Sequence, residues 1–175
     1  SNEKFDGDLL GRMVSDESHR QQLIKALLNF VQSNKFGGVC IDFEEPPTSA
    51  QSNLLTFMQE LHTTFSANKL LVTQAVPFAD AAWNYKAYNA ASDYSILMAY
   101  DQHYAGKEPG PVAAQSWFEQ TLVERMKGLN PAKTIVAIGS YGYDWSNMES
   151  EGKTVTFQEA LITAHESLEE GAKPT

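Results

Sequence analysis

The fold is decided by one stretch, Gly37-Gly38-Val39-Cys40-Ile41-Asp42-Phe43-Glu44-Glu45-Pro46. Its apolar residues alternate with acidic or small ones: Val39, Ile41 and Phe43 against Cys40, Asp42 and Glu44. Period-two alternation predicts a short strand with one apolar face and one acidic face, on which Asp42 and Glu44 lie side by side. Burying two carboxylates costs several kcal/mol unless they are paired or used. The alternative is an edge strand whose acidic face meets water.

Composition limits the classes of protein that this chain can be. Its 175 residues suit one domain, residues 1–175, and a net charge of −9 without a Lys/Arg cluster argues against a nucleic-acid partner. Cys40 is the only cysteine, and the four histidines lack metal-ligand spacing, so neither an internal disulfide nor a metal site is expected. No apolar run reaches the roughly 20 residues of a membrane helix.

Hydrophobic periodicity predicts an alternation of helices and strands. A helix over Asp16–Val31, with Ser15 as its N-cap, follows a loop at residues 5–7. A second helix begins after Pro46 and presents an apolar stripe: Leu54, Leu55, Met58, Leu61 and Phe65. The remaining expected elements are strands at 70–77, 94–101 and 134–145, and helices at about 80–91, 114–129 and 156–168.

Four strands, each joined to the next by a helix, predict right-handed β-α-β units and a parallel sheet in an α/β fold. Chemically capable side chains collect where these strands end: Asp42, Glu44, Gln74, Tyr100, Asp101, Tyr141, Tyr143 and Trp145. In barrels and open sheets of this class the site lies at the carboxyl edge of the strands. We therefore expect a site at that edge.

Two motifs resemble those of glycoside hydrolase family 18, the chitinase-like enzymes. Val39 to Glu44 resembles the end of the family's D-x-x-D-x-D-x-E signature, and Met98 to Asp101 resembles its later M-x-Y-D motif. Gly139 to Trp145 is similar to the next strand end, where many members have Tyr-Gly-Arg and this chain has Tyr143 in place of the arginine. The residues in and after these motifs, Phe43-Glu44-Glu45-Pro46 and Tyr100-Asp101-Gln102-His103-Tyr104, most resemble family 18 domains of bacterial envelope proteins. Those proteins also carry polysaccharide deacetylase and glycosyltransferase domains. That implies a cell-envelope or extracytoplasmic location within a larger, membrane-associated protein.

The resemblance implies a retaining hydrolase of β-linked N-acetylglucosamine polymers that works by substrate assistance. Glu44 matches the acid that protonates the leaving oxygen, and Asp42 matches the residue that holds the acetamido group. Tyr100 would bond the acetamido carbonyl. The other residues expected to contact substrate are Asp101, Met98, Gln74, Tyr141 and Trp145, with Met98 contributing mainly packing. No metal or cofactor is implied.

Gly37 and Cys40 stand where the signature has its first two aspartates. With fewer like charges nearby, Asp42 should ionise more readily and the pKa of Glu44 should be raised less. This departure keeps a second function open, a binding or structural module that retains the sugar groove without turnover.

The chain also has fewer strands than a complete barrel. A (β/α)8 barrel takes about 250 residues and eight strands, whereas four strands are expected here, matching strands four to seven of a TIM-type barrel by motif order. Such a partial barrel would leave two apolar edge strands unpaired. We therefore expect the isolated chain to form a homo-oligomer with little hydrolase activity.

Overall fold

The computed structural model describes residues 7–43, 46–145 and 152–169. The chain forms two compact units: unit 1 comprises residues 1–97 and 124–136, and unit 2 comprises residues 98–123 and 137–175. Within the described ranges, no helix is both long and apolar enough to cross a membrane.

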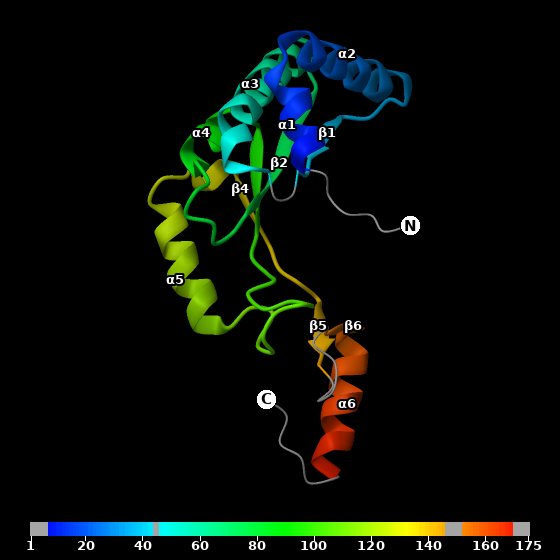
Figure 1. Ribbon diagram of the computed structural model, residues 1–175, viewed down its shortest axis with the longest axis vertical. Helices are drawn as coiled ribbons and strands as arrows, with labels where there is room; N and C mark the ends of the chain where they lie inside the picture. The colour runs from blue at the N-terminus through cyan, green and yellow to red at the C-terminus, as the bar shows by residue number, and fades with distance from the viewer. Residues whose placement is uncertain (1–6, 44–45, 146–151, 170–175) are drawn as a thin grey trace. The chain divides into compact units, whose positions relative to one another are not determined.

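Unit 1 is built on a four-stranded sheet whose strand order follows the sequence (Figure 1). Its strands are β1 (Gly38–Ile41), β2 (Leu71–Pro77), β3 (Tyr94–Met98) and β4 (Thr134–Ala137), with the last residue of β3 and of β4 assigned to unit 2. Successive strands are connected by helices: η1 (Thr48–Ala50) and α3 (Gln51–Ala67), then α4 (Tyr85–Ala90), then α5 (Gln115–Met126) and η2 (Pro131–Lys133). The predicted alternation of strand and helix is confirmed, and β1 and β4 are the outer strands.

The pairing of β1 with β2 determines which side chains share a face of the sheet. The two strands run parallel, with Ile41 opposite Gln74 and Cys40 opposite Thr73. Residues paired in this way project to the same face, and their neighbours project to the other. Ile41 and Gln74 are buried, whereas Cys40 is exposed. One face of the strand pair is therefore covered and the other is open.

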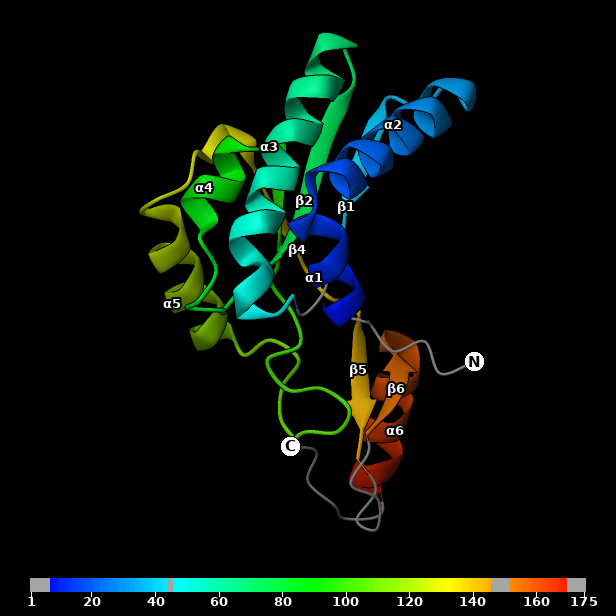
Figure 2. The same cartoon turned by 45° about the horizontal axis from the view of Figure 1, so that its top comes forward.

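Helix α3 covers the buried face. Figure 2 shows α3 running alongside β2, and the ring of Phe43, just beyond β1, lies 6.1 Å from that of Phe57 on α3. The buried residues of α3 are Leu54, Phe57, Met58, Leu61 and Phe65. This confirms the predicted stripe except at one position, because Leu55 is only half-buried and Phe57 points into the core instead.

The N-terminal helices differ from the prediction in two ways. A helix, α1 (Gly7–Ser15), occupies a segment for which only a loop at its start was expected. Helix α2 (Glu17–Ser33) is capped by Asp16, whose carboxylate accepts from the backbone N–H of His19. Ser15 is not the cap, because its hydroxyl donates to the carbonyl of Arg12 in the last turn of α1. An ionised Asp also suits the positive end of the helix dipole.

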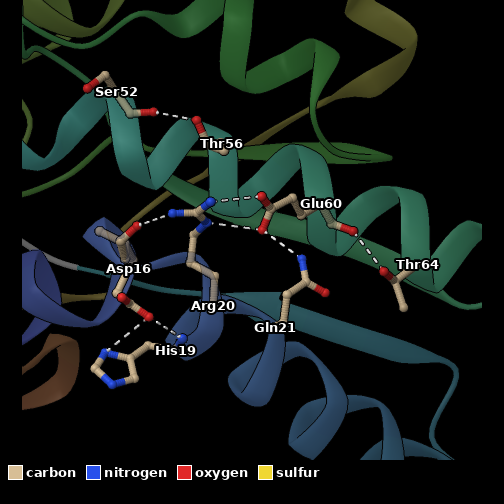
Figure 3. A network of polar contacts seen from close by, with 9 residues as sticks. Asp16, His19, Arg20, Gln21, Ser52, Thr56, Glu60 and Thr64 are labelled. Carbon is tan, nitrogen blue, oxygen red and sulfur yellow. Dashed lines mark hydrogen bonds and ion pairs between the residues drawn. The ribbon is translucent and has the colours of Figure 1, made fainter.

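Arg20 joins α2 to α3 through a charged hydrogen-bond network (Figure 3). Its Nε and Nη2 donate to the two carboxylate oxygens of Glu60, each at 3.0 Å, and its Nη1 donates to the carbonyl of Val14 at 2.9 Å. Gln21 adds a further donor to Glu60 at 3.2 Å. The hydrogen bond to Glu60 and its charge raise the pKa of Arg20 above its ordinary value, against the opposing effect of burial. This fork geometry satisfies a buried guanidinium that would otherwise destabilise the fold.

Unit 2 contains a second, smaller sheet that the sequence did not predict. Instead of one strand over 134–145, the chain leaves β4 at Ala137 and forms β5 (Tyr141–Asp144), which pairs antiparallel with β6 (Lys153–Thr156). Helix α6 (Phe157–Glu169) follows directly. Its start is a reciprocal cap, because Glu159 N–H donates to the Thr156 hydroxyl and Thr156 N–H donates to the Glu159 carboxylate.

We expect Glu60→Gln to destabilise the protein by about 2 kcal/mol, because it leaves the buried Arg20 guanidinium without its counter-charge. The matched control is Glu124→Gln, which removes the partner of Lys127 in an exposed pair. Urea unfolding of the two variants checks this. Equal unfolding midpoints would show that the network between α2 and α3 contributes no net stability.

Candidate active site

The structure places the predicted site residues in both units. Asp42 directly follows β1 in unit 1 and is exposed, and Glu44 lies outside the described residues. Met98 ends β3, and Tyr100 and Asp101 follow it in unit 2. Tyr141 is on β5 of that unit, and Trp145 comes just after the strand. Of the predicted residues in the described ranges, Asp42 and Gln74 therefore belong to unit 1, and the others belong to unit 2.

Gln74 requires a correction. It pairs with Ile41 and shares the covered face of the sheet, where its side chain is 1% exposed and its Oε1 has no hydrogen-bond partner among the described residues. Asp42 is one residue beyond Ile41, so strand alternation directs it to the opposite, open face with Cys40. Gln74 therefore does not line a site together with Asp42. Trp83 is buried and its ring stacks on that of Tyr88, with centroids 4.7 Å apart, so it belongs to the core.

Asp101, in unit 2, accepts hydrogen bonds from two tyrosine side chains. Its carboxylate Oδ1 accepts hydrogen bonds from the hydroxyls of Tyr141, at 2.6 Å, and Tyr143, at 3.0 Å. Its backbone has a φ of 58°, in the left-handed region that Asp tolerates better than most residues. Both the backbone and the side chain of Asp101 are thus held in a defined orientation.

Four rings form a continuous aromatic row beside Asp101, namely Tyr100, Tyr141, Tyr143 and Trp145. Successive ring centroids are 6.1, 5.7 and 5.5 Å apart. The last three rings share one face because they alternate along and just beyond β5. Trp145 also packs closely against Gly152, where an added Cβ would come within 2.7 Å of its Nε1. Rows of this kind offer flat faces on which sugar rings can stack.

The two phenols are held in their neutral form. Burial raises the pKa of both Tyr141 and Tyr143, and the hydrogen bond to Asp101 and its negative charge raise them further. The phenols therefore remain hydrogen-bond donors throughout the physiological range. Sequence analysis placed Tyr143 at a strand end, in the position of the family's arginine, but missed that its hydroxyl donates to Asp101. The i, i+2 spacing of Tyr141 and Tyr143 on a strand was the available signal.

The loop that follows Asp101 is closed by its own hydrogen bonds. Gln102 N–H donates to the carbonyl of Val112, and its side-chain oxygen accepts from Ala114 N–H. His103 Nδ1 lies 3.1 Å from the carbonyl of Glu108, and its ring lies against Gly110, where an added Cβ would approach it to 2.6 Å. His103 therefore shapes the loop. Within the described ranges, no cluster of three or more His, Cys, Asp or Glu side chains could hold a metal.

The chain matches the family model described as glycosyl hydrolases family 18 over residues 4–173. It is 27% identical over 164 residues to the uncharacterized glycosylase YvbX of Bacillus subtilis, covering 89% of this chain and 47% of that protein. It is 26% identical over 173 residues to mouse chitotriosidase-1, covering 82% and 37%. The chitinase from Chromobacterium violaceum superposes with a TM-score of 0.86 at 26% identity, covering 95% of this chain and 54% of that one. The chain thus spans less than half the length of these curated relatives.

Asp101→Asn should lower the pKa of Tyr141 and Tyr143 toward the ordinary value, because it removes the negative charge while keeping an acceptor and tolerating the left-handed backbone. Burial keeps both pKa values above that of a free tyrosine. Ultraviolet titration of tyrosinate, with circular dichroism monitoring the fold, measures the change. Asp144→Asn, at the exposed end of β5, is the control. Titration curves that coincide for both variants would contradict the charge effect.

Proposed function

The chain belongs to glycosyl hydrolases family 18, and on this premise we propose that it supplies the catalytic motifs of a retaining glycosidase acting on β-linked N-acetylglucosamine polymers. Relatives named chitinase and chitotriosidase support this substrate class for the chain. The activity is proposed for the whole protein.

One observation carries the proposal: both catalytic motifs follow strands of the same sheet. Asp42 comes directly after β1, and Tyr100 and Asp101 come directly after β3. Carboxyl ends of strands are where α/β barrels hold their chemistry. The open face of the β1–β2 pair, which carries Asp42, is also the face that α3 leaves free.

The proposed mechanism uses the substrate's own acetamido oxygen as nucleophile. Glu44 donates a proton to the glycosidic oxygen as the bond to the anomeric carbon breaks, and the acetamido oxygen bonds to that carbon. Asp42 stabilises the positive charge that develops on the acetamido group, and Tyr100 orients its carbonyl. Water then attacks the anomeric carbon and breaks its bond to the acetamido oxygen, Glu44 takes a proton from that water, and the configuration is retained.

A carbohydrate-binding module without turnover is the second candidate. The departures at Gly37 and Cys40 favour it, because Asp42 lacks the neighbouring carboxylates of the family signature. The exposed Cys40 lies on the same open face as Asp42, where it offers neither a negative charge nor a strong hydrogen bond. The aromatic row would serve this function equally well.

We also propose that the four strands correspond to strands four to seven of a (β/α)8 barrel. The outer positions of β1 and β4 support this, as does the 54% share of the related chitinase chain that is covered. Two segments, Phe43–Pro46 and Tyr100–Tyr104, resemble the family 18 domains of bacterial envelope proteins. This resemblance supports a location in the cell envelope or outside the cytoplasm, within a larger membrane-associated protein.

Glu44→Gln in the full-length protein should abolish hydrolysis of N-acetylglucosamine oligomers and leave their binding within a few fold, because the amide keeps the shape of the acid but has no acidic proton. Product chromatography and calorimetric binding measure the two effects. Binding by a wild-type protein that releases no product would favour the non-catalytic module. Full turnover by the Glu44→Gln variant would contradict the assignment of Glu44 as the general acid.

The 175-residue chain on its own should form a homo-oligomer, most simply a two-fold dimer, and show little hydrolase activity. Its outer strand β4 carries Ile135 at 46% exposure, and Ile138 just beyond it is 75% exposed. An unprotected apolar edge is a template for another chain. Light scattering at micromolar concentration measures the mass, and a compact monomer would overturn this expectation.

A further inference from the structure

We propose that Tyr143 is a positioning residue of the substrate site that acts through Asp101. Together, Tyr141 and Tyr143 hold one oxygen of the Asp101 carboxylate, so that the other oxygen is left to accept a hydrogen bond from a sugar hydroxyl. This inference rests on the proposed function and adds a residue to it.

The geometry of the two donors supports this role. Both phenols end on Oδ1, at 2.6 Å from Tyr141 and 3.0 Å from Tyr143. Their rings meet edge to face, with an interplanar angle of 85°, so the two hydroxyls that approach this oxygen are carried by rings of different orientation. A single donor would let the carboxylate swing about one hydrogen bond, whereas two donors restrict it. Positioning is thus shared by the two tyrosines.

The second carboxylate oxygen has unused capacity. An ionised carboxylate has about four lone-pair sites, and both phenols use sites on Oδ1. Within the described part of unit 2, no residue donates to Oδ2. Asp101 is only half-buried, so a ligand can reach it. The unused acceptor is therefore the part of Asp101 available to a substrate.

The charge of Asp101 makes that acceptor a strong one. Both donors are neutral phenols, and Asp101 forms no salt bridge with any residue in the described ranges. Unit 2 carries three Lys and Arg residues against ten Asp and Glu. An arginine at position 143 would have brought a positive charge beside the carboxylate. With Tyr143 instead, the carboxylate is oriented without a counter-ion among the residues that the structure describes, and hydrogen bonds to a charged acceptor are the stronger class.

A double-mutant cycle tests the inference in the full-length protein, in a Glu44→Gln background that prevents turnover. The variants are Tyr143→Phe, Asp101→Asn and the two combined, and calorimetry measures the dissociation constant for an N-acetylglucosamine oligomer. Phe keeps the ring contacts with Tyr141 and Trp145 and removes only the hydroxyl. We expect Tyr143→Phe to weaken binding about fivefold when Asp101 is present and less than about twofold when it is Asn. Tyr94→Phe, on an exposed tyrosine of β3, is the control for loss of a phenol hydroxyl.

The outcomes separate the inference from the proposed function. Equal losses from Tyr143→Phe in both backgrounds, or no loss at all, would overturn the positioning role while oligomer binding upholds the substrate class. Absence of oligomer binding in the parent Glu44→Gln protein would overturn both. A melting temperature that falls in step with affinity in both backgrounds would assign Tyr143 a structural role only, again against the inference.

Discussion

The parallel pairing of β1 with β2 is the constraint on which the rest of unit 1 depends. Placing Ile41 opposite Gln74 assigns alternate residues to a covered and an open face, and a shift by one residue would exchange them. Phe43 can then meet Phe57 of α3, while Asp42 stays on the open face. The packing of Phe43 against α3 and the position of Asp42 are consequences of the same register.

Local pattern was sufficient to predict the four strands of the unit 1 sheet and the helices that connect them, because period-two and helical spacing each leave a clear signature, but α1 was missed. The N-cap was harder: Ser15 and Asp16 are both good capping residues, and the preference was decided by α1, which uses the Ser15 hydroxyl at its own end. The break between β4 and β5 was missed although Gly139 and Ser140, residue types that are common in turns, lie between the two strands. The antiparallel pairing of β5 with β6 is a tertiary contact, which the pattern of residues 134–145 does not encode.

The site predictions rested on motif and on strand position. Tyr100 and Asp101 were predicted because they follow a strand within a specific motif. Gln74 was chosen because it is a polar residue in a strand, and only the register with Ile41 shows that it belongs to the covered face. The contact between Tyr143 and Asp101 spans 42 residues of sequence, and residue-by-residue patterning does not encode a contact of that range. Long-range partners of a motif are where sequence reasoning ends in this protein.

The left-handed backbone of Asp101 limits how this position can vary. Apart from glycine, Asn is the residue closest to Asp that accepts such a conformation readily, and a β-branched or bulky residue there would be strained by about 1 kcal/mol or more. Conformation and chemistry thus select the same small group of residues, and only Asp combines the backbone tolerance with a negative charge. Drift at this position would therefore pass first through Asn, which preserves the local fold and loses the charge, so that a descendant could keep its shape after losing its chemistry.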